Sequence, residues 1–326
     1  MKKIEILIPQ YKETNEIVKP LLDSIALQQN INMAEIGVII VNDGTDVKLD
    51  EKWLKSYPYD IQYYHNEHKG VSATRNACLD HATAEYVMFC DADDMFYNMC
   101  GLWIVMREIN NGGFDSLTSA FVEEGRHPQT KEPLYLTRQI DSTFVHGKVH
   151  RRQYLIDQNI RWNDSLTIHE DSYFNCLCQK LSQNVKYCPT PFYLWKWRDD
   201  SVCRSDFKYI LKTYNNMLDS NTALVNEFLK RNHYQDAQFY ATSMIYDAYF
   251  TMNKKEWLDQ ENQEYRHKTE LRFKTYYKTF KHLMETIPLE VKTQIIQGIR
   301  NRFYGEGLLL ESITFETWIK HIQKLK

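Results

Sequence analysis

The chain has 326 residues, of which 43% are hydrophobic and 25% are charged, and its formal net charge is −3. This length suffices for one large or two smaller domains, and the composition is that of an ordinary globular protein. The nearly neutral charge excludes a global attraction to nucleic acid or anionic membrane, so that either partner would need a local basic patch.

The apolar runs are far too short to cross a bilayer, and the first ten residues, MKKIEILIPQ, lack the apolar core of a signal peptide. Seven cysteines form an odd set without paired zinc-ligand spacing: Cys78, Cys90, Cys100, Cys176, Cys178, Cys188 and Cys203. We expect buried free thiols in a reducing compartment, and therefore a cytoplasmic protein without a transmembrane segment.

The first hundred residues alternate between strand and helix patterns. Short runs of β-branched and aromatic residues predict strands at 4–9, 36–44, 61–65 and 85–90. An apolar residue at every fourth position predicts a helix between the first two runs, where Pro20 favours a late start or a kink. A second helix is predicted after Gly70. This alternation predicts a parallel sheet covered by helices, with ligands at the carboxyl ends of its strands.

The remaining sequence changes character near residue 205. Residues 115–125 and 191–197 predict strands, and 169–181 predict a helix. From about residue 205 the pattern is helical, with one apolar face formed by Leu211, Tyr214, Leu218 and Leu224. We predict a catalytic domain at 1–204 and a helical C-terminal region at 205–326 that serves packing or acceptor binding.

Polar segments follow three of the predicted strands: PQYKE, NDGTD and DADD. Neither a dinucleotide-binding G-x-G-x-x-G nor a P-loop occurs, so another feature must neutralise any phosphates. In an extended segment Asp91 and Asp93 point the same way, because they are two residues apart. Two such carboxylates can share a hard divalent cation that also bridges a diphosphate. The alternative is a solvated polar turn after a buried strand.

Two residues near the other strand ends could contact a nucleotide. Asp43, directly after the second strand, can accept a hydrogen bond from a ring N–H of a uracil-type base, or it can belong to an ordinary Asp-Gly turn. Arg75, about one turn into its helix, can meet the base or a phosphate, or it can pair with a surface acid.

Two further groups carry charged residues that suit group transfer. Glu170 and Asp171 stand at a predicted helix start, where acids either complement the helix dipole or, in the case of Asp171, remove a proton from an acceptor hydroxyl. Arg198, Ser201 and Arg204 share a loop, either as solvated polar residues or as ligands that stabilise a departing diphosphate.

The order of these segments is more specific than any one of them. IPQYKE, VNDGTD, GVSATRN, CDADD, FVHGKVHRRQYL and HEDSYF, followed by YLWKW and SVCR, resemble the family 2 glycosyltransferases of the GT-A fold over roughly residues 4–204. The resemblance implies an α/β fold with a Rossmann-like mixed sheet flanked by helices. It also implies transfer of a sugar from a nucleotide diphosphate sugar, with Mn²⁺ or Mg²⁺ and with inversion of the anomeric carbon.

The resemblance assigns the nucleotide pocket to the first strand ends. It implies that Pro9 and Tyr11 form the floor of the pocket, with Glu13 at its edge. It implies that Asp43 binds the base and that Arg75 binds the base or ribose. Uridine is the expected nucleotide. The acceptor stays open between a surface glycan, a polyol phosphate such as teichoic acid, and a hydroxylated base of modified DNA.

The resemblance also implies a metal site. Asp93 corresponds to the direct metal ligand, and Asp91 to a contact of the ribose or of the metal shell. A third ligand has no fixed place in the pattern, and His146 and His169 are its candidates.

The catalytic assignments follow in the same way. Asp171 corresponds to the catalytic base, and Glu170 beside it orients the acceptor or the donor sugar. Arg198, Ser201 and Arg204 lie where the family holds the diphosphate.

Residues 266–283 are locally basic and aromatic, with Phe273, Tyr277 and Phe280 at helical spacing. We expect an amphipathic helix packed on the catalytic domain; the alternative is a surface for a polyanionic acceptor. Two other functions stay open. A nucleotidyltransferase would release pyrophosphate, and a non-catalytic module would bind a sugar nucleotide or glycan without turnover.

Overall fold

The computed structural model describes residues 2–139, 141, 143–199, 207–254, 257, 263–305 and 313–326, without the side chains of 207–212. It divides into two compact units, Met1–Ser201 and Val202–Lys326. The predictions that concern Ser201, Cys203, Arg204 and Leu211 lie outside the described residues and side chains.

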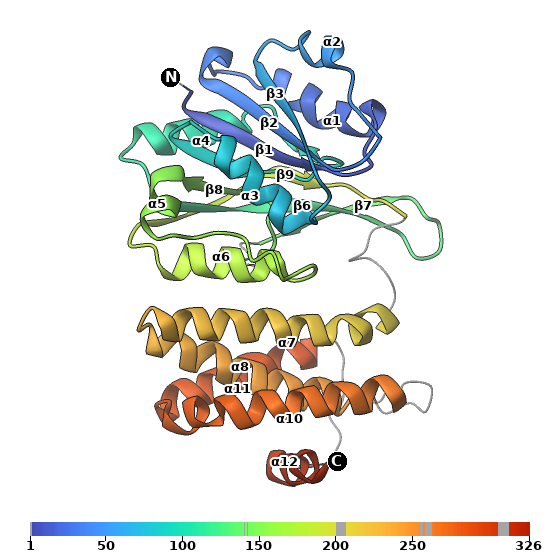
Figure 1. The fold of residues 1–326 in the computed structure, drawn as a ribbon, viewed down its shortest axis with the longest axis vertical. Coiled ribbons are helices and arrows are strands. Elements are labelled where there is room, and N and C mark those ends of the chain that lie inside the picture. The colour runs from blue at the N-terminus through green and yellow to red at the C-terminus, as the bar shows by residue number, and fades with distance from the viewer. Residues whose placement is uncertain are drawn as a thin grey trace. The chain divides into compact units, whose positions relative to one another are not determined.

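Within the described residues of the first unit, nine strands form one mixed sheet in the order β3-β2-β1-β4-β8-β6-β9-β5, with β7 paired to β6 (Figure 1). The pairs β1–β2, β2–β3, β1–β4 and β6–β9 are parallel, and the other pairs are antiparallel. The strand bounds are β1 Ile4–Gln10, β2 Ile36–Asp43, β3 Asp60–Asn66, β4 Tyr86–Phe89, β5 Met95–Phe96, β6 Ser116–Arg126, β7 Pro133–Arg138, β8 Lys148–Arg151 and β9 Val185–Trp195.

The helices of this unit cover both faces of the sheet. Their bounds are α1 Asn15–Ala26, α2 Glu51–Leu54, α3 Val71–His81, α4 Gly101–Asn110, α5 Arg152–Asp157 and α6 Glu170–Lys180, with a 3₁₀ turn at Met33–Glu35. The predicted α/β sheet flanked by helices is therefore confirmed, as are the four strands and two helices predicted in the first ninety residues.

Side-chain alternation along the strands decides which helices pack on which face. Alternate residues of β1, beginning with Ile4 and Ile6, share one apolar core with α1 and α4. On the other face, α3 packs on β1 and β2, and Phe174 of α6 lies 5.7 Å from Phe89 of β4. Because both faces are buried, these central strands are continuously apolar rather than alternating.

Pro20 favours a late start or a kink of the first helix, and of these two alternatives the late start is wrong. Helix α1 begins at Asn15 and contains Pro20. The proline removes one backbone donor. The buried side chains of α1, including Leu21 and Ile25, nevertheless pack into the core and hold the helix through that position.

The second unit is a group of helices around α8: α7 Phe207–Lys230, α8 Tyr234–Met252, α10 Gln263–Thr286, α11 Leu289–Gly305 and α12 Phe315–Lys324. The predicted aromatic face of α10 is buried, and its ring contacts within the described residues are with residues of the second unit, while its packing on the catalytic domain stays a prediction. Phe273 lies 5.0 Å from Trp318 of α12, and Phe280 lies 4.9 Å from Tyr276 of α10 itself. The helices of this unit supply the apolar surface that the face requires.

Six cysteines lie within the described residues as free thiols; five are buried, as expected, and Cys100 is partly exposed. In the part of the chain that the structure describes, none of the helices is both long enough and apolar enough to span a membrane.

Candidate active site

The carboxyl ends of three neighbouring parallel strands meet at one edge of the sheet. Residue Gln10 of β1 is paired with Asn42 of β2, and Leu7 of β1 with Phe89 of β4. The Gln10 amide donates to the carbonyl oxygens of Glu13 (2.9 Å) and Val47 (3.1 Å), which fastens the loops after β1 and β2 to each other. The predicted convergence of the three polar segments is confirmed.

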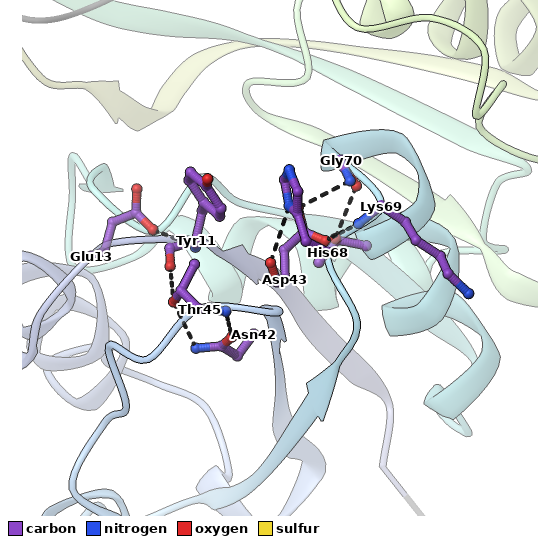
Figure 2. A network of polar contacts seen from close by, with 9 residues as sticks. Tyr11, Glu13, Asn42, Asp43, Thr45, His68, Lys69 and Gly70 are labelled. Carbon is purple, nitrogen blue, oxygen red and sulfur yellow. Dashed lines mark hydrogen bonds and ion pairs between the residues drawn. The ribbon is translucent and has the colours of Figure 1, made fainter.

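Asp43 organises the first part of this edge (Figure 2). Its buried carboxylate accepts hydrogen bonds from the backbone N–H groups of Lys69 (2.8 Å) and Gly70 (3.1 Å), and its Oδ2 lies 2.9 Å from Nδ1 of His68. Asp43 therefore fixes the loop that leads from β3 into α3. The predicted contact between Asp43 and a base stays a prediction.

Tyr11 and His68 form an aromatic surface beside Asp43. Their rings stack with centroids 5.0 Å apart and an interplanar angle of 26°, and both side chains remain largely exposed. A flat, exposed pair of rings suits stacking by a planar base. The sequence pattern did not single out His68, since its partners come from two other loops.

The loops that contain Gly44 and His68 approach each other so closely that position 44 requires a glycine. Gly44 has φ +70°, and a Cβ atom on it would lie 2.2 Å from the backbone nitrogen of His68. Only glycine fits a left-handed position with so little space.

The acidic segment after β4 is a turn, closed by a hydrogen bond from the Asp94 N–H to the Asp91 carbonyl (3.2 Å). The expectation that Asp91 and Asp93 point the same way is wrong, because the turn ends the extended geometry on which it rests. Asp91 contacts Nη2 of Arg75 at 2.8 Å, whereas Asp93 contacts Nη1 of Arg198 at 2.9 Å. Arg198 also lies 3.6 Å from Glu13, so it connects the ends of β1 and β4.

Asp94 is the buried member of the acidic turn. It accepts hydrogen bonds from the Tyr193 hydroxyl (2.6 Å) and from the Lys196 N–H (2.9 Å). Burial, reinforced by Asp93 and Asp91, raises the pKa of Asp94 well above its ordinary value.

His146 completes a group that can hold a metal ion. Its buried ring stacks on the rings of Tyr193 and Trp195, and its Nδ1 lies 3.8 Å from Oδ2 of Asp94. One ligand atom from each of Asp91, Asp94 and His146 lies within 4.8 Å of the others. Two carboxylates and an imidazole suit a divalent ion such as Mn²⁺. Of the two histidines suggested as a third ligand, His146 is in this group.

Glu170 and Asp171 occupy the first turn of α6, as expected. His169, directly before them, has φ +63°, a conformation that few residues other than glycine adopt. Arg75 donates from Nη1 to Glu170 (2.8 Å) while its Nη2 bonds Asp91. One guanidinium, that of Arg75, therefore connects the acidic turn with the Glu170–Asp171 pair, which contains the predicted general base.

Asp171 has the protonation behaviour that suits a general base. Burial raises its pKa to about 7, and the neighbouring Glu170 adds to this effect; Arg75, the Ser172 N–H and Lys148 oppose it. A base works best when its pKa lies near the working pH. Lys148 is itself buried, and its Nζ donates to the Phe144 carbonyl. Its motif belongs to the resemblance, but its burial could not be deduced from spacing.

Solved structures share this fold. The crystal structure of Staphylococcus aureus TarS in complex with UDP-GlcNAc aligns with a TM-score of 0.64 at 17% identity, over 94% of this chain and 92% of that chain. The mannosyltransferase PcManGT from Pyrobaculum calidifontis, in complex with GDP-Man and Mn²⁺, aligns with a TM-score of 0.50 at 13% identity, over 99% and 84%. These likenesses define the fold, which is the GT-A fold of glycosyltransferases.

Residues 5–173, more than half of the chain, match the model of glycosyl transferase family 2. The chain therefore belongs to glycosyl transferase family 2.

Curated relatives carry related names. Bacillus subtilis EpsJ, named a glycosyltransferase, is 22% identical over 225 residues, which are 63% of this chain and 64% of EpsJ. TarS, named a poly(ribitol-phosphate) beta-N-acetylglucosaminyltransferase, is 27% identical over 191 residues, 53% of this chain and 32% of TarS. The minor teichoic acid biosynthesis protein GgaB of Bacillus subtilis is 28% identical over 181 residues, which are 49% of this chain and 19% of GgaB. The chain spans less than two thirds of the length of these relatives.

Proposed function

We propose that this chain transfers a sugar from a uridine diphosphate sugar to a hydroxyl group, with inversion of the anomeric carbon and with a divalent metal ion. The observation that carries the proposal is the position of Arg75, which bonds both Asp91 in the acidic turn and Glu170 beside Asp171. The acidic turn suits a metal-bound diphosphate, and Asp171 suits a base at neutral pH. Sugar transfer requires these two functions in one site.

The proposed nucleotide site lies at the ends of β1 and β2. The exposed rings of Tyr11 and His68 offer a stacking surface, with Pro9 at the end of β1 and Glu13 beside it. Asp43 fixes the loop that presents His68. The TarS complex with UDP-GlcNAc is the more similar of the two aligned structures, which supports uridine over guanosine.

The ligand atoms of Asp91, Asp94 and His146 fit a divalent ion, which these three residues would hold together. Asp93 can join them once Arg198 leaves it for the diphosphate of the donor. When bound, the ion would neutralise part of the diphosphate charge and improve the leaving group. PcManGT, which shares the fold, was solved with Mn²⁺, and this supports a metal of that kind.

In the proposed step, Asp171 accepts the proton of the acceptor hydroxyl as the hydroxyl oxygen bonds to the anomeric carbon. The bond from that carbon to the diphosphate oxygen breaks, and its electron pair leaves with UDP. Attack from the face opposite the diphosphate inverts the anomeric carbon. Arg198 meets the charge that develops on the leaving diphosphate, and Glu170 orients the acceptor or donor sugar.

We propose a polyol-phosphate polymer as the acceptor. The names of TarS and GgaB, which both refer to teichoic-acid-type polymers, support this choice. A neutral glycan and hydroxymethylated DNA are the other acceptors to be compared with it.

The test is a transfer assay with purified protein, Mn²⁺, a panel of UDP-GlcNAc, UDP-glucose, UDP-galactose and GDP-mannose, and each of the three acceptors. UDP release together with a heavier acceptor supports the proposal, and Asp171→Asn should slow both by about 10²–10⁴-fold. In a parallel incubation with UTP and a sugar 1-phosphate, release of pyrophosphate would instead identify a nucleotidyltransferase. Nucleotide-sugar binding without turnover on any acceptor would identify a non-catalytic binding module.

A further inference from the structure

The side chain of Arg75 is buried and fixed by contacts within the protein. Its side chain, on α3, is about 5% exposed, and its guanidinium lies 4.5 Å from the centre of the Trp162 ring. Nη1 bonds Glu170 and Nη2 bonds Asp91, each at 2.8 Å. Both terminal nitrogens therefore already have a carboxylate partner, and an aromatic ring fixes the plane of the group.

The two partners belong to different parts of the site. Asp91 lies in the acidic turn after β4, where the donor diphosphate is proposed to bind. Glu170 begins α6, next to Asp171. Arg75 is 16 residues from the first and 95 residues from the second. A planar fork with two parallel donors is the side chain best able to fix two carboxylates relative to each other.

We infer that Arg75 is a positioning residue, which fixes the Glu170–Asp171 pair relative to the acidic turn and supplies the positive charge that keeps Asp171 available as a base. This inference rests on the proposed function. It replaces the direct contact with base or ribose that the family resemblance implies for Arg75. Lysine cannot perform this role, since one ammonium group cannot present the same fork to both acids.

The charges around Asp171 agree with this role. The guanidinium of Arg75 lowers the pKa of Asp171, whereas Glu170 raises it, so the two partners of one ion pair act on Asp171 in opposite directions. Lys148 on β8 also lowers it. The other titratable groups on the elements around α6 include His150 on β8, Asp141 in the preceding loop, Tyr154 on α5, and Tyr173, Cys176, Cys178 and Lys180 on α6 itself.

The test follows the ionisation of Asp171 without any substrate. Protein labelled with ¹³C at the aspartate carboxyl carbons is titrated by NMR, and Asp171→Asn identifies the resonance. Arg75→Gln should move the midpoint upward by roughly one pH unit, and Glu170→Gln should move it downward. Arg161→Gln is the matched control, because Arg161 makes a bidentate ion pair with Asp80 on the surface of the same unit. This control should leave the midpoint unchanged.

Arg75→Lys provides the second variant if Arg75→Gln does not fold. It keeps the charge but loses the fork. The Asp171 midpoint should therefore stay near that of the wild type, while the sugar-transfer rate falls at least tenfold. Shifts of the same sign in Arg75→Gln and Glu170→Gln, or a wild-type transfer rate in Arg75→Lys, would overturn the inference. Because the titration needs no donor, absence of sugar transfer would refute the proposed function without changing the NMR result.

Discussion

The hydroxyl of Tyr193 donates a hydrogen bond of 2.6 Å to the carboxylate of Asp94, 99 residues earlier in the chain. Both side chains are buried. This bond ties the last residues of β9 to the acidic turn after β4, and it places the Tyr193 ring against His146. Strand β9, which is distant from the acidic turn in the sequence, therefore stabilises that turn through Tyr193.

Removal of that hydroxyl should destabilise the protein. Tyr193→Phe removes the hydroxyl donor from the buried Asp94 carboxyl group and leaves it the Lys196 N–H, and we expect a loss of about 1–3 kcal/mol in the free energy of unfolding. Urea denaturation followed by circular dichroism measures this loss. Tyr64→Phe is the matched control, since the Tyr64 hydroxyl bonds Gln62 near the surface, and it should change stability by no more than about 0.5 kcal/mol. Equal effects of both substitutions would remove the supporting role of Tyr193.

Substitutions of Asp93 and Asp171 should affect different steps: Asp93 should affect donor binding, and Asp171 should affect proton removal. Asp93→Ala should weaken the Mn²⁺-dependent part of UDP binding, measured by calorimetry with and without EDTA, and should abolish transfer. Asp171→Asn should lower kcat by about 10²–10⁴-fold and leave UDP binding as in the wild type. If both variants lose UDP binding equally, the roles assigned to them are wrong.

Transfer should depend on pH through Asp171. Its pKa is raised to about 7, so the carboxylate form that accepts a proton prevails above this pH and is lost below it. We expect kcat/KM to fall about tenfold for each pH unit below that value. The measurement is a rate profile from pH 5 to 9 with UDP release as the signal. Asp171→Asn should lack this acid limb, and a profile that is flat through pH 7 in the wild-type protein would contradict the assignment of the base.

The turn at Gly44 should tolerate no side chain. Gly44→Ala would place a Cβ atom 2.2 Å from the backbone nitrogen of His68 at a left-handed φ, and we expect a loss of more than about 2 kcal/mol in the free energy of unfolding. The displaced His68 should also weaken UDP binding. Gly298→Ala is the control: Gly298 lies exposed within α11 with nothing near its Cβ position, so alanine there should stabilise the protein by up to about 1 kcal/mol. A neutral Gly44→Ala would show that the two loops can separate without cost.

Much of the fold follows from the sequence alone. The apolar runs at 36–44 and 85–90 and the helix after Gly70 are local patterns, and local patterns decide whether a segment becomes a strand or a helix. The order of the polar segments also identifies the family, because the residues that follow each strand carry the chemistry. The late start expected at Pro20 is wrong because packing of α1 into the core, rather than local preference, decides where that helix begins.

The partners within the site were decided only by the tertiary structure. The sequence places Asp91, Asp93 and Asp94 next to one another, but a turn directs them to Arg75, Arg198 and Tyr193 respectively. The packing of α3 on β1 and β2 brings Arg75 to the turn, and the pairing of β9 with β5 and β6 brings Tyr193 and Arg198 there. Sequence spacing determines which residues share a helix or strand. The order of the strands in the sheet determines which elements are neighbours. An ion pair between distant residues depends on which elements are neighbours, and only the tertiary structure shows this.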